Sequence, residues 1–217
     1  MADATERVPP LENRIRSLPS LEPTRHLGKI PGCIEPSTSK KKNKSATPSY
    51  AVIDSQSVKT TSYNEQWGID GGKKVKGRKR HIVVDTLGNL ISVIVHAANI
   101  HDTKGGCDVV KEAAKKHESI LGFSGDEGYR GTTFEFVKNE LKLNMEISKK
   151  IKDEFAVLPI RWIVERTFAW LGHYRRLSKD YEILTRSAEN MIRIAMLRIT
   201  VAKSVWYFQD RFLQHPG

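Results

Sequence analysis

Two apolar runs joined by a short turn constrain the fold of this chain more than any other feature of its sequence. The first run is RHIVVDT, from Arg80 to Thr86, and the second is LISVIVHAA, from Leu90 to Ala98. Both are rich in Val and Ile, which favour strands, and the Leu-Gly-Asn connection around Gly88 is short enough to join antiparallel neighbours. The fold must therefore contain an antiparallel hairpin.

The segments around this hairpin alternate between strand-like and helix-like patterns. A brief apolar run, AVID, precedes it and ends at Asp54. After it the patterns predict a helix, a strand, a helix, a strand and two long helical stretches: Thr103–His117 with Asp102 or Thr103 as N-cap, Ser119–Ser124, Thr132–Leu141, Leu143–Ser148, Pro159–Glu182 and Ala188–Trp206. Three antiparallel strands followed by βα units predict an α/β fold with a mixed sheet flanked by helices.

The composition divides the chain into three parts. Residues 1–50 carry most of the prolines and the charged run Lys40–Lys44, so we predict a linker-like or disordered segment there. Residues 51–206 carry the patterned elements and are predicted to form the folded domain. Residues 207–217 are predicted to be a C-terminal tail.

The charge of the chain indicates a polyanionic partner. Its 36 Lys and Arg residues exceed its 25 Asp and Glu residues and give a net charge of +11. Nucleic acid is the commonest partner of such a protein, and no apolar run is long enough to span a bilayer. Met1–Leu18 lacks the apolar core of a signal peptide, and Cys33 and Cys107 match no disulfide or zinc spacing. We therefore expect a cytoplasmic protein that binds nucleic acid and no membrane.

Three acidic residues stand out by their settings. Asp54 closes the first strand, and Asp126 follows a later strand among glycines that allow a tight bend. Functional groups collect at strand ends, so these two aspartates are expected to converge at one edge of the sheet. Glu165 lies on a helical stretch whose apolar positions, at three- and four-residue steps, predict one buried face: Ile160, Ile163, Val164, Thr167, Phe168 and Leu171.

Such a cluster of carboxylates favours a divalent cation. The carboxylates repel one another unless a cation neutralises them, and their hard oxygen atoms suit Mg²⁺ or Mn²⁺. Two ions can activate an attacking oxygen and stabilise the leaving one in phosphodiester cleavage. Each acid also has a purely structural interpretation: Asp54 and Asp126 as caps of turns, and Glu165 as the ion-pair partner of Arg161. The competing acids are Asp85, Asp102 and Asp180.

Basic residues gather in two places. A Gly- and Lys-rich stretch before the hairpin is interpreted as a flexible loop that contacts phosphates, with a solvated loop as the alternative: Lys73, Lys74, Lys76, Arg78, Lys79 and Arg80. Arginines also surround Glu165, at Arg161, Arg166, Arg175 and Arg176. We interpret Trp162, Trp170 and Trp206 as packing residues rather than base-stacking groups.

Several motifs, in this order, resemble one family. The segments AVIDSQSVKTT, GKKVKGRKRHIVVDTLG, ANIHD, GDEGYRG and RWIVERTFAWLGHYRRLSKDYE are similar to the catalytic domain of bacterial insertion-sequence transposases of the DDE type, in the group named after insertion sequence five. The resemblance covers roughly Ala51–Ser204. It implies an RNase H-like fold in which Asp54, Asp126 and Glu165 are catalytic and hold two Mg²⁺ (or Mn²⁺) ions. It also implies that the arginines around Glu165 face DNA.

The same resemblance implies a reaction and partners. Metal-dependent endonuclease cleavage would free the ends of an insertion sequence, and strand transfer would join them to target DNA. The enzyme would act as a homo-oligomer on double-stranded DNA, in association with the bacterial nucleoid. Relatives carry an ordered helical N-terminal region that residues 1–50 do not resemble, and a related group carries Tyr and Lys where this chain has Leu158 and Gly172. We therefore expect an atypical or truncated N-terminus, with an inactive DNA-binding remnant or an RNase H-like nuclease as alternative functions.

Overall fold

The computed structural model describes residues 47–61, 64–148 and 159–213, with side chains for residues 160–205 of the last range. All of these residues belong to one structural unit, Ser45–Gly217. Residues 1–46, most of the predicted linker, lie outside the described residues. Within the described ranges, no helix combines the length and apolarity needed to cross a membrane.

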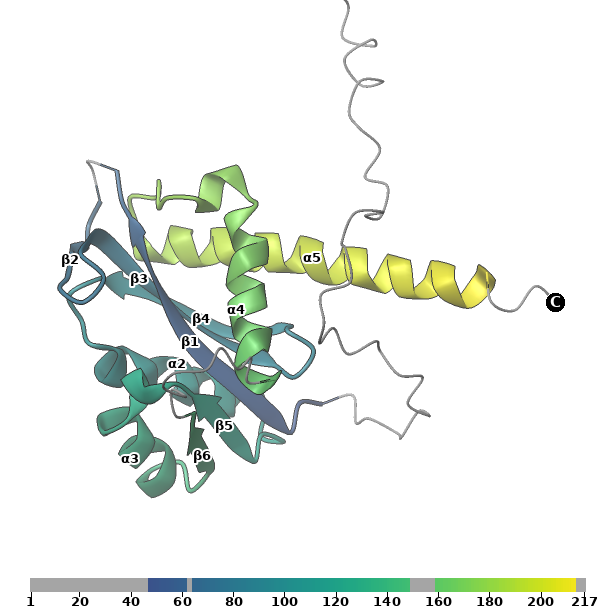
Figure 1. Cartoon of the computed structure of the whole chain (residues 1–217), viewed down its shortest axis with the longest axis horizontal. Helices are drawn as coiled ribbons and strands as arrows, with labels where there is room; N and C mark the ends of the chain where they lie inside the picture. Colours follow the sequence, from purple (N-terminus) through teal and green to yellow (C-terminus); the bar gives the residue numbers. More distant parts are fainter. Residues whose placement is uncertain (1–46, 62–63, 149–158, 214–217) are drawn as a thin grey trace, which may run out of the picture. The chain divides into compact units, whose positions relative to one another are not determined.

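One mixed sheet organises the domain (Figure 1). Its strands are β1 (Tyr50–Lys59), β2 (Gly68–Asp70), β3 (Val75–Asp85), β4 (Leu90–Ala97), β5 (Gly122–Gly125) and β6 (Asn144–Ile147). β3 pairs antiparallel with β1 along one edge and with β2 and β4 along the other. β5 then runs parallel to β1, and β6 runs parallel to β5. Antiparallel strands followed by parallel ones confirm the predicted RNase H-like mixed sheet.

The predicted hairpin is confirmed as β3 and β4. Asp85 holds its turn, because its Oδ1 accepts hydrogen bonds from the backbone N–H groups of Leu87 and Asn89, each at 2.8 Å. Gly88 has a φ of 80°, a left-handed conformation that glycine adopts readily. Asp85, one of the competing acids, therefore serves the turn.

Helices cover both faces of the sheet (Figure 1). They are α2 (Asp102–Lys116), α3 (Thr132–Asn139), α4 (Pro159–Gly172) and α5 (Thr185–Leu213), with the short 3₁₀ turns η1 (Glu127–Tyr129) and η2 (Arg175–Leu177). Successive strand residues point to opposite faces, so Val52 and Ile82 pack with α4 and α5, while Ile53 and Val83 pack with α2 and α3. The central strands are therefore buried on both sides.

The interpretation of the Gly- and Lys-rich stretch as a flexible loop is wrong from Val75 onward. These residues begin β3, which pairs with β1 from Gly77 to Asp85. Gly77 allows this close approach, since a Cβ there would overlap the carbonyl oxygen of Val58. The backbone pairing of an extended β1 thus draws a polar stretch into the sheet.

The helix predicted over Pro159–Glu182 ends earlier, at Gly172. Its buried face is confirmed at Val164, Thr167, Phe168 and Leu171, with Ile163 partly buried against the same core. Ile160, in the first turn of α4, is an exception, with 38% of its surface exposed.

Two other helix boundaries differ from the predictions. The N-cap of α2 is His101, whose Nδ1 accepts from the backbone N–H of Thr103 at 3.3 Å. Helix α5 begins at Thr185 and continues to Leu213, into the predicted tail. Neither difference moves the predicted acids out of their elements.

Candidate active site

Asp54 lies on β1, the strand between β3 and β5. Its side chain is half-buried, and its Oδ1 accepts a hydrogen bond from the backbone N–H of Ser55 at 2.7 Å. Burial raises the pKa of Asp54 to about 7. The hydrogen bond from Ser55 opposes this rise, and the charge of nearby Asp126 adds to it. The ionised form of Asp54 would therefore be stabilised by a further cation.

Asp126 follows β5 directly. Because β5 is the parallel neighbour of β1, with Ser124 opposite Val52, the two strands carry Asp126 and Asp54 to the same end of the sheet. Asp126 is also the N-cap of η1, where its Oδ1 accepts from the N–H of Gly128 at 2.9 Å. The structural interpretation as a turn cap thus holds for Asp126, and it fixes the carboxylate near Asp54.

Glu165 reaches the same region from α4, which packs on β1 and β5. Its side chain is 51% exposed, off the buried face of the helix. Arg161 connects it to the second aspartate: its Nε lies 2.9 Å from Oε1 of Glu165 and its Nη2 lies 3.8 Å from Oδ2 of Asp126. The first contact is an ion pair without hydrogen-bond alignment, since Nε finds no hydrogen-bond partner. The structure therefore places Asp54, Asp126, Arg161 and Glu165 in one region.

The donor set suits a hard divalent cation. Carboxylate oxygens are the ligands that Mg²⁺ and Mn²⁺ prefer, and the guanidinium of Arg161 stands between two of these carboxylates as a cation does. Within residues 47–61, 64–148 and 159–213, no three His, Cys, Asp or Glu side chains are gathered closely enough to hold an ion as they stand.

The predicted basic run divides into exposed and buried halves. Lys73, Lys74 and Lys76 are exposed, and the Nζ of Lys73 lies 3.4 Å from the carbonyl oxygen of Ser55, beside the first acid. The buried half consists of three residues on β3 that are at most 5% exposed: Arg78, Lys79 and Arg80. Only the exposed half offers charge to a polyanion.

The buried arginines hold the segment between α4 and α5. Arg78 donates to the carbonyl oxygens of Gln66, Glu182 and Ile183 at 2.5–2.8 Å and lies 3.4 Å from the buried carboxylate of Asp180. Arg80 donates to the carbonyl oxygen of Leu177 at 2.8 Å. The prediction of DNA contact does not fit these two side chains, and Asp180 serves as the counterion of Arg78.

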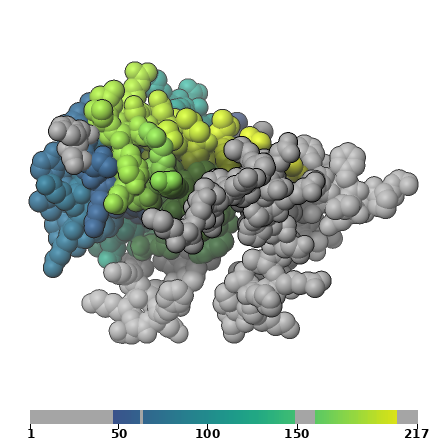
Figure 2. Space-filling model, turned by 90° about the horizontal axis from the view of Figure 1, so that it is seen from above, coloured from purple at the N-terminus to yellow at the C-terminus, as the bar shows by residue number. Residues whose placement is uncertain are grey.

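The arginines around Glu165 differ from one another. Arg166 is stacked between Trp162 and Trp170, at 4.5 Å from each ring, and donates to the carbonyl oxygen of Leu87 at 3.3 Å. Trp162 is 45% exposed, so the packing interpretation holds only for its face against Arg166. Arg175 and Arg176 are exposed, although Arg176 pairs with Glu182 at 2.9 Å. Figure 2 shows α4 and the segment after it, in green, on the molecular surface beside the blue surface of the first strands.

A buried polar network beneath the aspartates was not predicted. Tyr129 is 1% exposed, and its hydroxyl lies 2.9 Å from Nδ1 of His81. Burial raises the pKa of Tyr129 well above 10, and the charges of Asp54, Asp102 and Asp126 add to the rise. Burial also lowers the pKa of His81 to about 3, so its ring is neutral. Two residues in the sequence could have indicated this network, Tyr129 in GDEGYRG and Asp102 in ANIHD, but no periodicity connects them.

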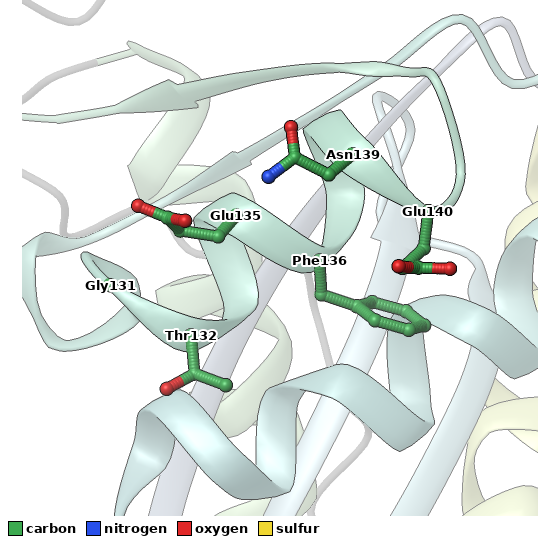
Figure 3. Close-up of a pocket in the computed structure, with 6 residues that line it drawn as sticks. All are labelled: Gly131, Thr132, Glu135, Phe136, Asn139 and Glu140. Carbon is green, nitrogen blue, oxygen red and sulfur yellow. The ribbon is translucent and has the colours of Figure 1, made fainter.

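A hollow of about 490 Å³ lies apart from this region, on α3 (Figure 3). It is lined by Gly131, Thr132, Glu135, Phe136, Asn139 and Glu140. None of the predicted site residues belongs to it.

Among curated proteins and solved structures, several are similar to this chain. A putative transposase for insertion sequence element IS402 from Burkholderia cepacia is 29% identical over 115 residues, which is 49% of this chain and 54% of that protein. The chain thus matches about half the length of this curated relative. The comparison does not distinguish the insertion sequence five group, which stays a prediction.

Two solved structures have a similar arrangement of elements. The catalytic core of BIV integrase has a TM-score of 0.41 at 11% identity, covering 69% of this chain and 81% of that one. The HTLV-2 integrase catalytic core in complex with magnesium has a TM-score of 0.41 at 16% identity, covering 70% and 86%. The order and direction of the strands in this chain's own sheet establish its fold. Residues 45–199 match the family model described as "Transposase DDE domain", and the chain therefore belongs to the family of transposases with a DDE domain.

Proposed function

We propose that this domain cuts and rejoins the ends of an insertion sequence by metal-dependent phosphoryl transfer, with Asp54, Asp126 and Glu165 as the catalytic, metal-binding acids. The observation that carries the proposal is their convergence from two parallel strands and one packed helix, bridged by Arg161, within residues that match the family model. Bound Mg²⁺ or Mn²⁺, two ions by family analogy, would neutralise the acids and stabilise charge on the attacking and leaving oxygens.

The proposed reaction has two steps, in which the chain's own residues would position the DNA. In the first step a water oxygen attacks phosphorus, the bond to the 3′ oxygen breaks, and that oxygen leaves as a 3′-hydroxyl. The freed hydroxyl then attacks a target phosphodiester, forming a new P–O bond and releasing a target 3′-hydroxyl. Cations that are exposed, together with partly exposed Arg161, would hold the phosphates: Lys73, Lys74, Lys76, Arg161, Arg175 and Arg176.

Double-stranded DNA is the proposed partner, both as the element's ends and as the target. Joining two ends in one event requires two active sites, so we propose that the protein acts as a homo-oligomer on DNA. Its substrate would place its action on the bacterial chromosome. These proposals concern the whole protein, because the chain matches only about half the length of its curated relative.

The test uses labelled double-stranded DNA carrying the sequences that flank the gene, with the full chain and Mg²⁺ or Mn²⁺. We expect cleavage and strand transfer by the wild type and a loss of about a hundredfold or more in Asp54→Asn, Asp126→Asn and Glu165→Gln. Glu135→Gln, on α3, is the matched control and should react like the wild type. Equal rates in wild type and Glu165→Gln would remove Glu165 from the proposal.

The same assay separates the alternative functions. Salt-sensitive DNA binding without cleavage by the wild type would indicate an inactive remnant. Cleavage without joining would indicate a nuclease.

A further inference from the structure

We propose that Asp102, at the start of α2, is a positioning residue that holds both catalytic aspartates from beneath. This inference rests on the proposed function of Asp54 and Asp126. Asp102 is joined to the first aspartate through one residue, Ser55, and to the second through the turn at Gly128. It belongs to a polar network that neither the family match nor the proposed reaction assigns a role.

The connection to Asp54 is a pair of hydrogen bonds. The hydroxyl of Ser55 donates to Oδ1 of Asp102 at 2.9 Å, and the backbone N–H of Ser55 donates to Oδ1 of Asp54 at 2.7 Å. Ser55 is only 8% exposed, so water does not readily replace either bond. Asp102 therefore fixes the residue whose amide orients the first aspartate.

The connection to Asp126 runs through the turn at Gly128, beside which Asp102 lies. A Cβ on Gly128 would lie 3.4 Å from Oδ2 of Asp102 and 3.0 Å from Oδ1 of Asp126. The carboxylate of Asp102 thus lies against the turn whose N–H orients the second aspartate. Tyr129, the next residue, closes the same turn from below through its contact with His81.

Lys79 explains why Asp102 positions the site rather than joining it as a ligand. The Nζ of Lys79, on a side chain 6% exposed, lies 3.0 Å from Oδ1 of Asp102 and 3.6 Å from Oδ2 of Asp70. Burial raises the pKa of Asp102, but Lys79 and Ser55 outweigh it and hold that pKa below its usual value. The charge of Asp102 is therefore present and already compensated by Lys79.

The test measures Mn²⁺ binding by the full chain without DNA, from the electron paramagnetic resonance signal of free Mn²⁺. We expect Asp102→Ala and Ser55→Ala each to weaken Mn²⁺ affinity about tenfold, the usual effect of losing an outer partner of a metal ligand. The double variant should be no more than about twofold weaker than either single one, because both changes break the same hydrogen bond. Asp108→Ala, an exposed acid on the same helix, is the matched control and should bind like the wild type.

A purely structural role would lower the unfolding temperature without changing the Mn²⁺ affinity of the folded protein. Wild-type affinity in Asp102→Ala, or losses in the two single variants that multiply in the double one, would overturn the inference. If Asp102→Ala does not fold, Ser55→Ala alone decides, and wild-type affinity there overturns it. Asp54→Asn separates the two proposals: unchanged affinity in this variant contradicts the proposed function itself, whereas a loss there with none in Ser55→Ala contradicts only the role of Asp102.

Discussion

Nε of Arg161 lies 2.9 Å from Oε1 of Glu165, one turn further along α4, and the same guanidinium reaches Asp126 at 3.8 Å. Both carboxylates belong to the proposed metal site. The positive charge of Arg161 repels a divalent cation from these oxygens, so Arg161 and the cation compete for them. Displaced by the ion, the arginine would be free to contact a DNA phosphate.

We predict that Arg161→Met strengthens Mn²⁺ binding in the absence of DNA. Two unit charges about 4 Å apart in water interact by about 1 kcal/mol, so a divalent ion would gain about 2 kcal/mol, which corresponds to roughly thirtyfold in affinity. The same variant should bind DNA more weakly, with the slope of log affinity against log salt reduced by about one. Arg186→Met, an exposed arginine on α5, should leave Mn²⁺ affinity unchanged. Weaker Mn²⁺ binding in Arg161→Met would contradict the competition.

The two halves of the basic run should respond oppositely to substitution. Arg78→Met leaves the buried carboxylate of Asp180 without its cation, so we expect a loss of about 3–5 kcal/mol in the free energy of unfolding, measured with urea. Lys74→Met should change stability by less than about 0.5 kcal/mol but weaken DNA binding. Adding Asp180→Asn to Arg78→Met should restore part of the stability. A stable Arg78→Met protein would argue against the buried ion pair.

The sequence predicted those parts of the fold that depend on local patterns. The hairpin followed from two apolar runs around Gly88, and the buried face of α4 followed from the spacing of Val164, Phe168 and Leu171. The sequence does not predict the start of β3, because Arg78 and Arg80 are polar and their guanidinium groups are satisfied chiefly by carbonyl groups about a hundred residues away in sequence. Tertiary contacts override local polarity there.

Local sequence patterns also predicted the candidate acids, but they did not predict the residues that orient those acids. Asp54 and Asp126 each end or follow an apolar strand, which is visible in the sequence. Asp102 and Ser55 are joined by a hydrogen bond across 47 positions, and no sequence spacing indicates it. A single sequence therefore gives candidates for a site, whereas the residues that orient them emerge only from the packing.

Asp70 gives a prediction about acid stability. Burial raises its pKa, but hydrogen bonds from Ser57 and the backbone of Lys73, with the charge of Lys79, lower it overall from 3.8 to about 2. Stability from a lowered carboxyl pKa is complete above the unfolded-state pKa and is lost as the pH falls through the folded-state pKa. Asp70→Asn should therefore be less stable by about 2 kcal/mol at neutral pH, with the difference vanishing between about pH 4 and pH 2.

Denaturation with urea at several pH values measures this difference. Asp108→Asn, on the exposed face of α2, controls for the general effect of removing an acid. A difference between wild type and Asp70→Asn that stays constant down to pH 2 would show that the lost stability comes from shape and not from charge.

Gly105 gives the last prediction, since glycine early in α2 weakens a helix unless packing requires it. A Cβ at this position would overlap Nε2 of His96 and lie 2.7 Å from Nε2 of His81, two rings buried on β4 and β3. Replacing glycine by alanine in a helix normally stabilises it by about 0.5–1 kcal/mol, but here we expect Gly105→Ala to destabilise the protein by about 1–3 kcal/mol.

The matched control is Gly172→Ala at the end of α4, where a Cβ meets no described atom within 4 Å, so stability should be unchanged or slightly higher. Because the clash pushes α2 away from the sheet, it also draws Asp102 away from Ser55, and Gly105→Ala should lose Mn²⁺ affinity together with stability. Thermal unfolding and Mn²⁺ titration of the two variants measure both effects. If Gly105→Ala proves as stable as Gly172→Ala, α2 does not pack so closely on the rings of His81 and His96.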